Sequence, residues 1–236
     1  MELAGRPISG VCCRAEPPCA DKAGCGSGRL FANTRGGAVY SFKRCSAPGC
    51  EATVLSGSEF CASHHPDPKA YAEDTLTRLA GTHTIKNENL SGLMLEGADL
   101  SGKRFYACSF ARSALKNVTF AGSLFRMCFF DFCQADSCDF SGVDAQFCSF
   151  AGARLFNASF ENSELIHNNF NGLAAESCTF SFSNLYNSRF MMANFRSTDF
   201  VDCNLKNAWL IDTVENEVSW KYSNLQEAVR SMEDAE

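Results

Sequence analysis

Residues 101–130 read SGKRFYACSFARSALKNVTFAGSLFRMCFF, and every fifth residue of this stretch is apolar. These positions continue without a break from Leu90 to Leu210, and of the twenty-five, thirteen are Phe, nine Leu and three Ala. A helix would repeat apolar residues at spacings of three and four, and a strand at every second residue, so neither produces a period of five. The period therefore indicates a repeat unit of its own.

A small residue usually stands two positions before each apolar centre, and the other three positions are mostly polar or Gly. This A-x-[LF]-x-x pattern resembles the pentapeptide-repeat family. The resemblance implies an all-β solenoid, a right-handed quadrilateral β-helix of about seven coils with four repeats per coil. Centres twenty residues apart should then stack, and they do segregate by type. One such column reads Leu100, Phe120, Phe140, Phe160, Phe180, Phe200.

The β-helix is expected over residues 83–227. Two residues within this range interrupt the pattern. Lys103 occupies a small-residue position, which predicts a local bulge. Glu215 occupies an apolar centre, which predicts an irregular side over residues 213–217 that keeps the phase. Trp220 and Leu225 continue the period beyond it. Residues 228–236 are expected to form a tail or a short helix.

A capping helix is predicted over residues 67–82. Asp67 is a suitable N-cap and Pro68 a suitable first helical residue. Tyr71, Thr75, Leu76 and Leu79 would share one face. A helix lying across the open end of a β-helix would cover unpaired strand edges.

Residues 45–66 contain the spacing Cys45-x4-Cys50-x10-Cys61-x2-His64, with His65 adjacent. Three thiolates and one imidazole suit a tetrahedral Zn²⁺ ion. We therefore predict a small structural zinc module, similar to a treble-clef or zinc-knuckle finger, in which either His64 or His65 is the fourth ligand. A loose Cys-rich linker is the alternative.

Residues 1–44 form a Cys-rich segment with flexible composition, in which a second metal site is a weaker hypothesis. Its candidate ligands are Cys12, Cys13, Cys19 and Cys25. Seven further Cys lie at inward small-residue positions of the repeats, where Cys acts as a small apolar side chain. Reduced structural thiols indicate a reducing compartment.

Composition excludes several classes. There is no apolar run of the ~20 residues that a membrane span needs, and residues 1–10 lack a signal-peptide core. A cytoplasmic protein without membrane contact is expected. The net charge of -6 and the pI near 5.3 argue against direct nucleic-acid binding, although Lys43 and Arg44 precede the zinc module. No catalytic motif stands out from the repeat background, so an enzyme is not expected.

Two outward surfaces are candidate binding sites. An apolar strip is expected to bind a partner protein, a second copy or residues 1–44. It comprises Tyr106, Met127, Phe129, Phe147, Ile166 and Tyr186. An acidic face without basic residues flanks the Phe120 to Phe200 column. It carries Asp99, Asp139, Glu161 and Asp199.

These features predict a non-catalytic scaffold or adapter that binds a protein partner. The alternative is a DNA mimic that binds, protects or inhibits a type II topoisomerase such as DNA gyrase, because some members of the family that the repeats resemble do so. A homodimer through the C-terminal end, with Trp209, Ile211 and Trp220 at the contact, would favour this alternative. A net charge of -3 over residues 84–212 is mild for a mimic of DNA.

Overall fold

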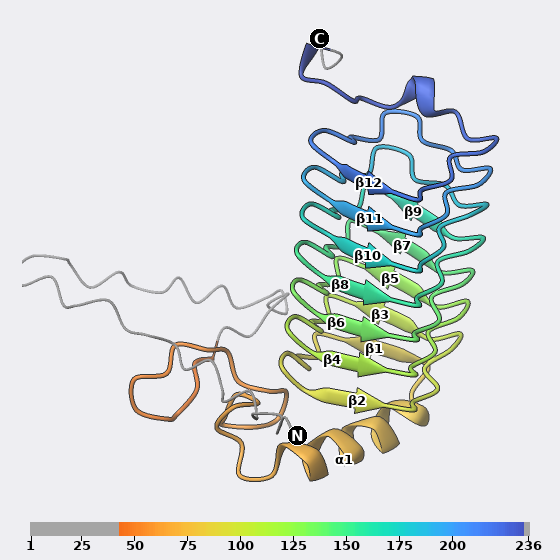
Figure 1. Cartoon of the computed structure of the whole chain (residues 1–236). Helices are drawn as coiled ribbons and strands as arrows, with labels where there is room; N and C mark the ends of the chain where they lie inside the picture. The colour runs from red at the N-terminus through yellow and green to blue at the C-terminus, as the bar shows by residue number, and fades with distance from the viewer. Residues whose placement is uncertain (1–42, 234–236) are drawn as a thin grey trace, which may run out of the picture. The chain divides into compact units, whose positions relative to one another are not determined.

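Each five-residue repeat forms one side of a square coil, because its centre points inward and its neighbours point out. The computed structural model describes residues 43–233 (Figure 1). Every strand pairs in parallel with a strand twenty residues away, as Leu95 does with Leu115 and Phe105 with Phe125. The predicted four repeats per coil are therefore confirmed, and the described chain forms a β-helix of about seven coils.

Two sides of the coil carry the regular strands, each three residues long. The five-stranded sheet has the order β1-β3-β5-β7-β9. Its strands are β1 (Thr84–Lys86), β3 (Arg104–Tyr106), β5 (Leu124–Arg126), β7 (Asp144–Gln146) and β9 (Glu164–Ile166). The seven-stranded sheet has the order β12-β11-β10-β8-β6-β4-β2. Its strands are β2 (Met94–Glu96), β4 (Ala114–Lys116), β6 (Gln134–Asp136), β8 (Arg154–Phe156), β10 (Ala174–Glu176), β11 (Asn194–Arg196) and β12 (Val214–Asn216). The other two sides are joined by single parallel bridges, such as Asp99 to Thr119.

The interior is filled by stacked aromatic columns. Phe130 and Phe150 stack with ring centres 4.6 Å apart and planes 1° apart, and Phe140 stacks on Phe160 in the same way. Rings of neighbouring columns meet edge to face, as Phe140 and Phe150 do at 83°. Both arrangements are favourable for aromatic pairs. The continuous core leaves the outward side chains as the place where function must lie.

Corner residues explain why several large apolar side chains are exposed. The residue two positions after a centre has positive φ, for example Phe147 at 56° and Met192 at 56°. This left-handed conformation is uncommon for bulky residues. It turns the chain to the next side and directs the corner side chain outward, so Phe147 is 61% exposed and Met192 67%.

Both predicted irregularities are absent, and these two expectations were wrong. Lys103 forms no bulge, since β3 follows in regular register and the Lys103 ammonium reaches outward to donate hydrogen bonds to the carbonyls of Ala80 and Thr82, at 2.9 and 3.1 Å. Glu215 lies in the regular strand β12 and pairs with Phe195. Backbone pairing therefore tolerates a charged centre in the last coil, where Glu215 is exposed.

The predicted capping helix is present as α1 (Pro68–Ala80), which packs against the first coil (Figure 1). A carboxylate oxygen of Asp67 accepts a hydrogen bond from the backbone N–H of Ala70 at 2.9 Å, which caps the helix N-terminus. Thr75 and Leu79 are buried, and Leu79 is part of the core that continues into the β-helix. At the other end, a 3₁₀ turn at Leu225–Glu227 precedes Val229, which pairs with Trp209.

No helix within residues 43–233 has the length and the apolar character that crossing a membrane requires.

Candidate functional site

Four side chains of the N-terminal module converge. The ligand atoms of Cys45, Cys50, Cys61 and His64 all lie within 4.8 Å of one another. The Cys50 and Cys61 sulfurs are 3.9 Å apart, and His64 Nδ1 lies 3.4 Å from Cys61 Sγ and 3.7 Å from Cys45 Sγ. A group of three thiols and one imidazole at these separations could hold a metal ion.

Local turns bring these residues together. Residues 43–54 form a hairpin in which Arg44 bridges Thr53, and Gly49 takes a φ of 74° at its tip. The second turn has Gly57 at a φ of 73° and returns the chain toward Cys61. Glycine adopts such positive φ values without steric cost. The backbone N–H of His64 then donates to the carbonyl of Cys61 at 3.0 Å, which places the imidazole beside the thiols.

Hydrogen bonding favours a thiolate at Cys45. Burial raises the pKa of the Cys45 thiol, but hydrogen bonds with the backbone of Cys61 and Ala47, together with those to the side chains of Cys61 and His64, outweigh it and lower the pKa to about 6. One of these bonds runs from the Cys61 N–H to the Cys45 sulfur at 3.4 Å. Because the thiolate is the form of cysteine that ligates metals, this environment suits a ligand.

The two adjacent histidines have different positions. His64 belongs to the cluster, whereas His65 Nδ1 accepts a hydrogen bond from the backbone N–H of Asp67 at 3.2 Å. The His65 ring also packs against Tyr71, with ring centres 4.9 Å apart. His65 thus joins the module to the start of α1. Cys12, Cys13, Cys19 and Cys25 lie outside the described residues.

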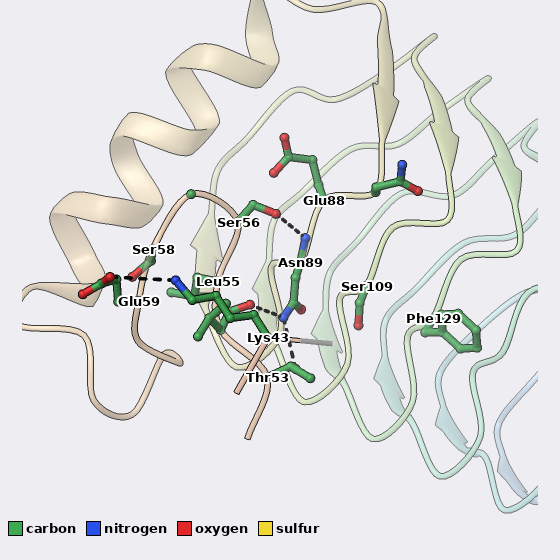
Figure 2. A pocket seen from close by; sticks show the side chains of 13 residues that line it. Lys43, Thr53, Leu55, Ser56, Ser58, Glu59, Glu88, Asn89, Ser109 and Phe129 are labelled. Atoms are coloured by element: carbon green, nitrogen blue, oxygen red, sulfur yellow. Dashed lines mark hydrogen bonds and ion pairs between the residues drawn. The ribbon is translucent and has the colours of Figure 1, made fainter. Parts of the chain in front are cut away.

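The module is fastened to the first coil by Asn89, which sequence reasoning missed. The Asn89 side-chain amide donates to the carbonyl of Val54 at 2.7 Å, and its backbone N–H donates to Ser56 Oγ at 2.7 Å (Figure 2). Leu55 is fully buried in the same core as the β-helix. Nothing in the sequence distinguishes Asn89 from other outward polar residues, because its partners lie more than thirty residues away.

A cleft of about 820 Å³ lies where the module meets the β-helix (Figure 2). It is lined by residues 53–59 with Lys43, and by Asn87, Glu88, Asn89, Ser109 and Phe129 of the β-helix. Lys43 and Glu59 form an exposed ion pair of 3.8 Å at its edge. Asn89 holds the cleft walls together, so the cleft has a defined shape.

The residues of the apolar strip lie on two adjoining sides of the coil, and in the ladder the polar Arg126 and Gln146 separate Tyr106 from Ile166. Tyr106, Ile166 and Tyr186 lie on the side of the five-stranded sheet and are half-buried, as is Phe129 on the adjoining side. Met127 and Phe147 project from the corner between those sides, with exposures of 48% and 61%.

His167, which sequence reasoning left isolated, extends this strip. Its ring stacks on Phe147 with centres 5.3 Å apart and planes 2° apart, and it meets Tyr186 edge to face at 5.8 Å. The lag of twenty from Phe147 could have predicted this neighbour.

Several carboxylates of the acidic face are engaged locally. A carboxylate oxygen of Asp99 accepts hydrogen bonds from the backbone N–H and the hydroxyl of Ser101, at 3.0 and 2.6 Å, and these bonds lower the pKa of Asp99. Asp139 likewise accepts from the backbone N–H of Ser141 at 2.9 Å. Glu161 accepts from the Thr179 hydroxyl at 3.4 Å. Asp199 lies in the same ladder, bridged to Thr179. Asp99 and Asp139 therefore stabilise turns of the coil.

The five-residue period and the parallel pairing every twenty residues place the described residues among the β-solenoids. In this fold, outward side chains stack in ladders on flat sides. Residues 176–210 match the family model described as pentapeptide repeats. Residues 176–210 therefore carry pentapeptide repeats, and the described residues form the parallel β-helix that the resemblance implied. Among curated proteins, none matches the chain.

The chain is similar to several solved structures, including the following three. HetL of the cyanobacterium Nostoc sp. strain PCC 7120, involved in heterocyst differentiation regulation, is 16% identical over 67% of this chain and 95% of HetL, with a TM-score of 0.28. QnrB1, a plasmid-mediated fluoroquinolone resistance protein, is 19% identical over 64% of this chain and 86% of QnrB1, with a TM-score of 0.28. A pentapeptide repeat protein of the cyanobacterium Cyanothece 51142 is 15% identical over 67% and 99%, with a TM-score of 0.31. At these values, nothing about the partner of this chain follows from these proteins.

Proposed function

We propose that this protein is a non-catalytic interaction scaffold, in which a pentapeptide-repeat β-helix carries a zinc-stabilised N-terminal module in a fixed orientation. The observation that carries the proposal is the convergence of Cys45, Cys50, Cys61 and His64 in a module that Asn89 fastens to the first coil. A scaffold needs binding surfaces at set positions, and a filled, regular β-helix supplies them.

The separations in the cluster support zinc. Tetrahedral zinc, with bonds of about 2.3 Å to sulfur and about 2.0–2.1 Å to nitrogen, requires sulfur atoms about 3.8 Å apart and sulfur about 3.5 Å from nitrogen. The sulfurs of Cys50 and Cys61 are 3.9 Å apart, and His64 Nδ1 lies 3.4 and 3.7 Å from two sulfurs. The module has only a small apolar cluster of its own, around Cys45, Val54 and Cys61. Bound metal would therefore contribute much of its folding free energy.

Zinc content of the purified protein tests this assignment. We expect about one zinc per chain by elemental analysis, and a large loss in the Cys50→Ser and His64→Ala variants. His65→Ala is the matched control and should retain zinc, because His65 lies outside the cluster. Protein without zinc, or Cys50→Ser protein with unchanged zinc, would refute the assignment.

The apolar strip is the proposed surface for a partner protein. The stacked pair of Phe147 and His167, with Tyr186 at the edge of the His167 ring and Met127 nearby, supplies aromatic and Met side chains of the kind that protein interfaces favour. Replacing Phe129 and Phe147 with Ser should abolish the capture of the partner. Phe182→Ser, a change at a 54% exposed residue of another corner, serves as the control. Unchanged capture by the double variant would remove the strip from the proposal.

The topoisomerase-binding DNA mimic remains the alternative proposal, and it has less support. Asp99 and Asp139 are hydrogen-bonded within their own turns, and residues 84–212 carry a net charge of only -3. DNA presents about one charge per 1.7 Å of its axis, a much denser array.

We also propose a cytoplasmic, reducing location. The seven repeat cysteines are buried and unpaired, and burial raises the pKa of Cys133 to about 12 and that of Cys178 to about 11. Such thiols act as small apolar groups that need no oxidation. Localisation of a tagged full-length protein tests this proposal, and export to an oxidising compartment would contradict it.

A further inference from the structure

The outward face of the seven-stranded sheet carries three charged side chains that have no partner among residues 43–233. Arg154 of β8, Glu176 of β10 and Arg196 of β11 make no side-chain hydrogen bond or ion pair within that part of the chain. Glu176 and Arg196 are direct ladder neighbours, yet they form no ion pair. By contrast, Glu96 and Lys116 on the same face are paired at 3.5 Å. Charged side chains of both signs on one flat face can form ion pairs with a complementary protein surface.

A hollow lies at the centre of this face. Ala174 is outward-facing between Arg154 on one side of the ladder and Asn194 on the other, so its methyl group leaves a gap between two larger polar side chains. The gap belongs to a groove of about 570 Å³, which Phe156, 45% exposed, also lines. Arginine and aromatic residues beside a hollow are the groups that most often dominate binding at protein interfaces.

The face is complementary to itself. Its outward residues form two ladders on either side of the buried centres. One ladder contains Arg154, Ala174 and Asn194, and the other contains Phe156, Glu176 and Arg196. When two copies lie side by side in parallel, a two-fold axis along the β-helix places each ladder opposite the other ladder of the partner.

In that arrangement, Glu176 faces the partner's Ala174. The carboxylate enters the gap and reaches the guanidinium of the partner's Arg154 and the amide of the partner's Asn194. Arg154 in turn faces the ring of the partner's Phe156, which suits a guanidinium. The two-fold symmetry makes each of these contacts twice.

We propose that this protein forms a parallel homodimer through the outer face of strands β2 to β12 of the seven-stranded sheet (Figure 1), with Glu176 of each copy seated in the Ala174 gap of the other. The surface is separate from the metal cluster and from the apolar strip. The proposal therefore goes beyond the scaffold function and is tested independently of it.

The size of the face predicts the strength of the dimer. Seven strands at a spacing of about 4.8 Å make it roughly 29 Å tall, and three to five residues make it roughly 10–16 Å wide. These dimensions give roughly 290–460 Å² per copy, below the ~800 Å² per partner of a standard specific interface, so we expect a weak dimer that dissociates in the high micromolar range.

Sedimentation velocity on the full-length protein, from low to high micromolar concentration, tests the dimer. We expect the wild type to pass from monomer to dimer across this range. Arg154→Glu and Glu176→Arg should each abolish the dimer, since each places like charges opposite one another. The double variant Arg154→Glu/Glu176→Arg should restore it, because the charges are exchanged and the pair is kept.

Arg104→Glu is the matched control. Arg104 is an exposed arginine of β3 on the other sheet, and it also makes no side-chain ion pair or hydrogen bond in residues 43–233. Its variant should dimerise like the wild type. A wild type that stays monomeric, a dimer that survives both single changes, or a double variant that is folded by circular dichroism and remains monomeric would each overturn the proposal.

Discussion

The indole Nε1 of Trp220 donates a hydrogen bond of 2.9 Å to a carboxylate oxygen of Glu215, in the last coil of the β-helix. The other carboxylate oxygen accepts from Arg230, also at 2.9 Å. The indole ring itself stacks on Phe200, with ring centres 4.4 Å apart. The aromatic column thus ends at Trp220, whose indole N–H is hydrogen-bonded to the charged Glu215 carboxylate. A solenoid needs such a polar end to stay soluble.

The Glu215→Leu variant tests this role. Leucine would continue the apolar column, but the end of the β-helix would then be apolar and without the acceptor for Trp220. We expect end-to-end association into species larger than a dimer, measured by light scattering. Glu215→Gln keeps an acceptor and should behave as the wild type. Equal behaviour of the leucine and glutamine variants would show that the charge does not protect this end.

Removal of the metal should unfold the N-terminal module and leave the β-helix intact. The module has few apolar contacts of its own, whereas the Phe columns make no use of the metal. After chelation we expect faster hydrogen exchange at residues 45–64 and unchanged exchange at residues 105–200. A cooperative loss of protection across both regions would contradict this prediction.

Asn89→Ala should loosen the module from the first coil. The change leaves the Val54 carbonyl without its donor, at a cost of about 1–3 kcal/mol. We expect faster hydrogen exchange at Ser56, whose N–H donates to the Asn89 carbonyl. Asn169→Ala, at the same ladder position four coils away, should leave the exchange of Ser56 unchanged.

A core phenylalanine and a corner phenylalanine should differ sharply in their effect on stability. Phe150 is 1% exposed and stacks between Phe130 and Phe170, so Phe150→Ala should lower the free energy of unfolding by about 3–5 kcal/mol. Phe147 is 61% exposed, so Phe147→Ala should change it by less than about 1 kcal/mol. Urea denaturation measures both, and similar losses would contradict the inward and outward assignment.

DNA-gyrase supercoiling should proceed unchanged in the presence of the purified protein, with or without a quinolone. The reason is the mild charge of the repeat region and the local hydrogen bonding of Asp99 and Asp139. Inhibition or drug protection at submicromolar protein would instead make the topoisomerase alternative the primary function.

The period of five residues indicated a repeat unit of its own and the inward or outward direction of its side chains. The resemblance to the pentapeptide-repeat family implied the β-helix and its twenty-residue coil, and the segregation of residue types at a spacing of twenty agreed with it. These properties follow from local backbone geometry, which repeats whenever the pattern repeats. The spacing of Cys45, Cys50 and Cys61 could likewise be interpreted from the sequence, because short turns bring residues that are close in sequence together in space.

Only the tertiary structure decided the contacts between distant segments. It placed His64 rather than His65 beside the thiols, joined Asn89 to Val54, and set Ala174 between Arg154 and Asn194. It also showed that Lys103 and Glu215 fit a regular coil. Sequence reasoning misread those two because it treated a charged residue at an inward position as a break. At the ends of a solenoid the charge can instead reach solvent or a free carbonyl, and that depends on what packs there.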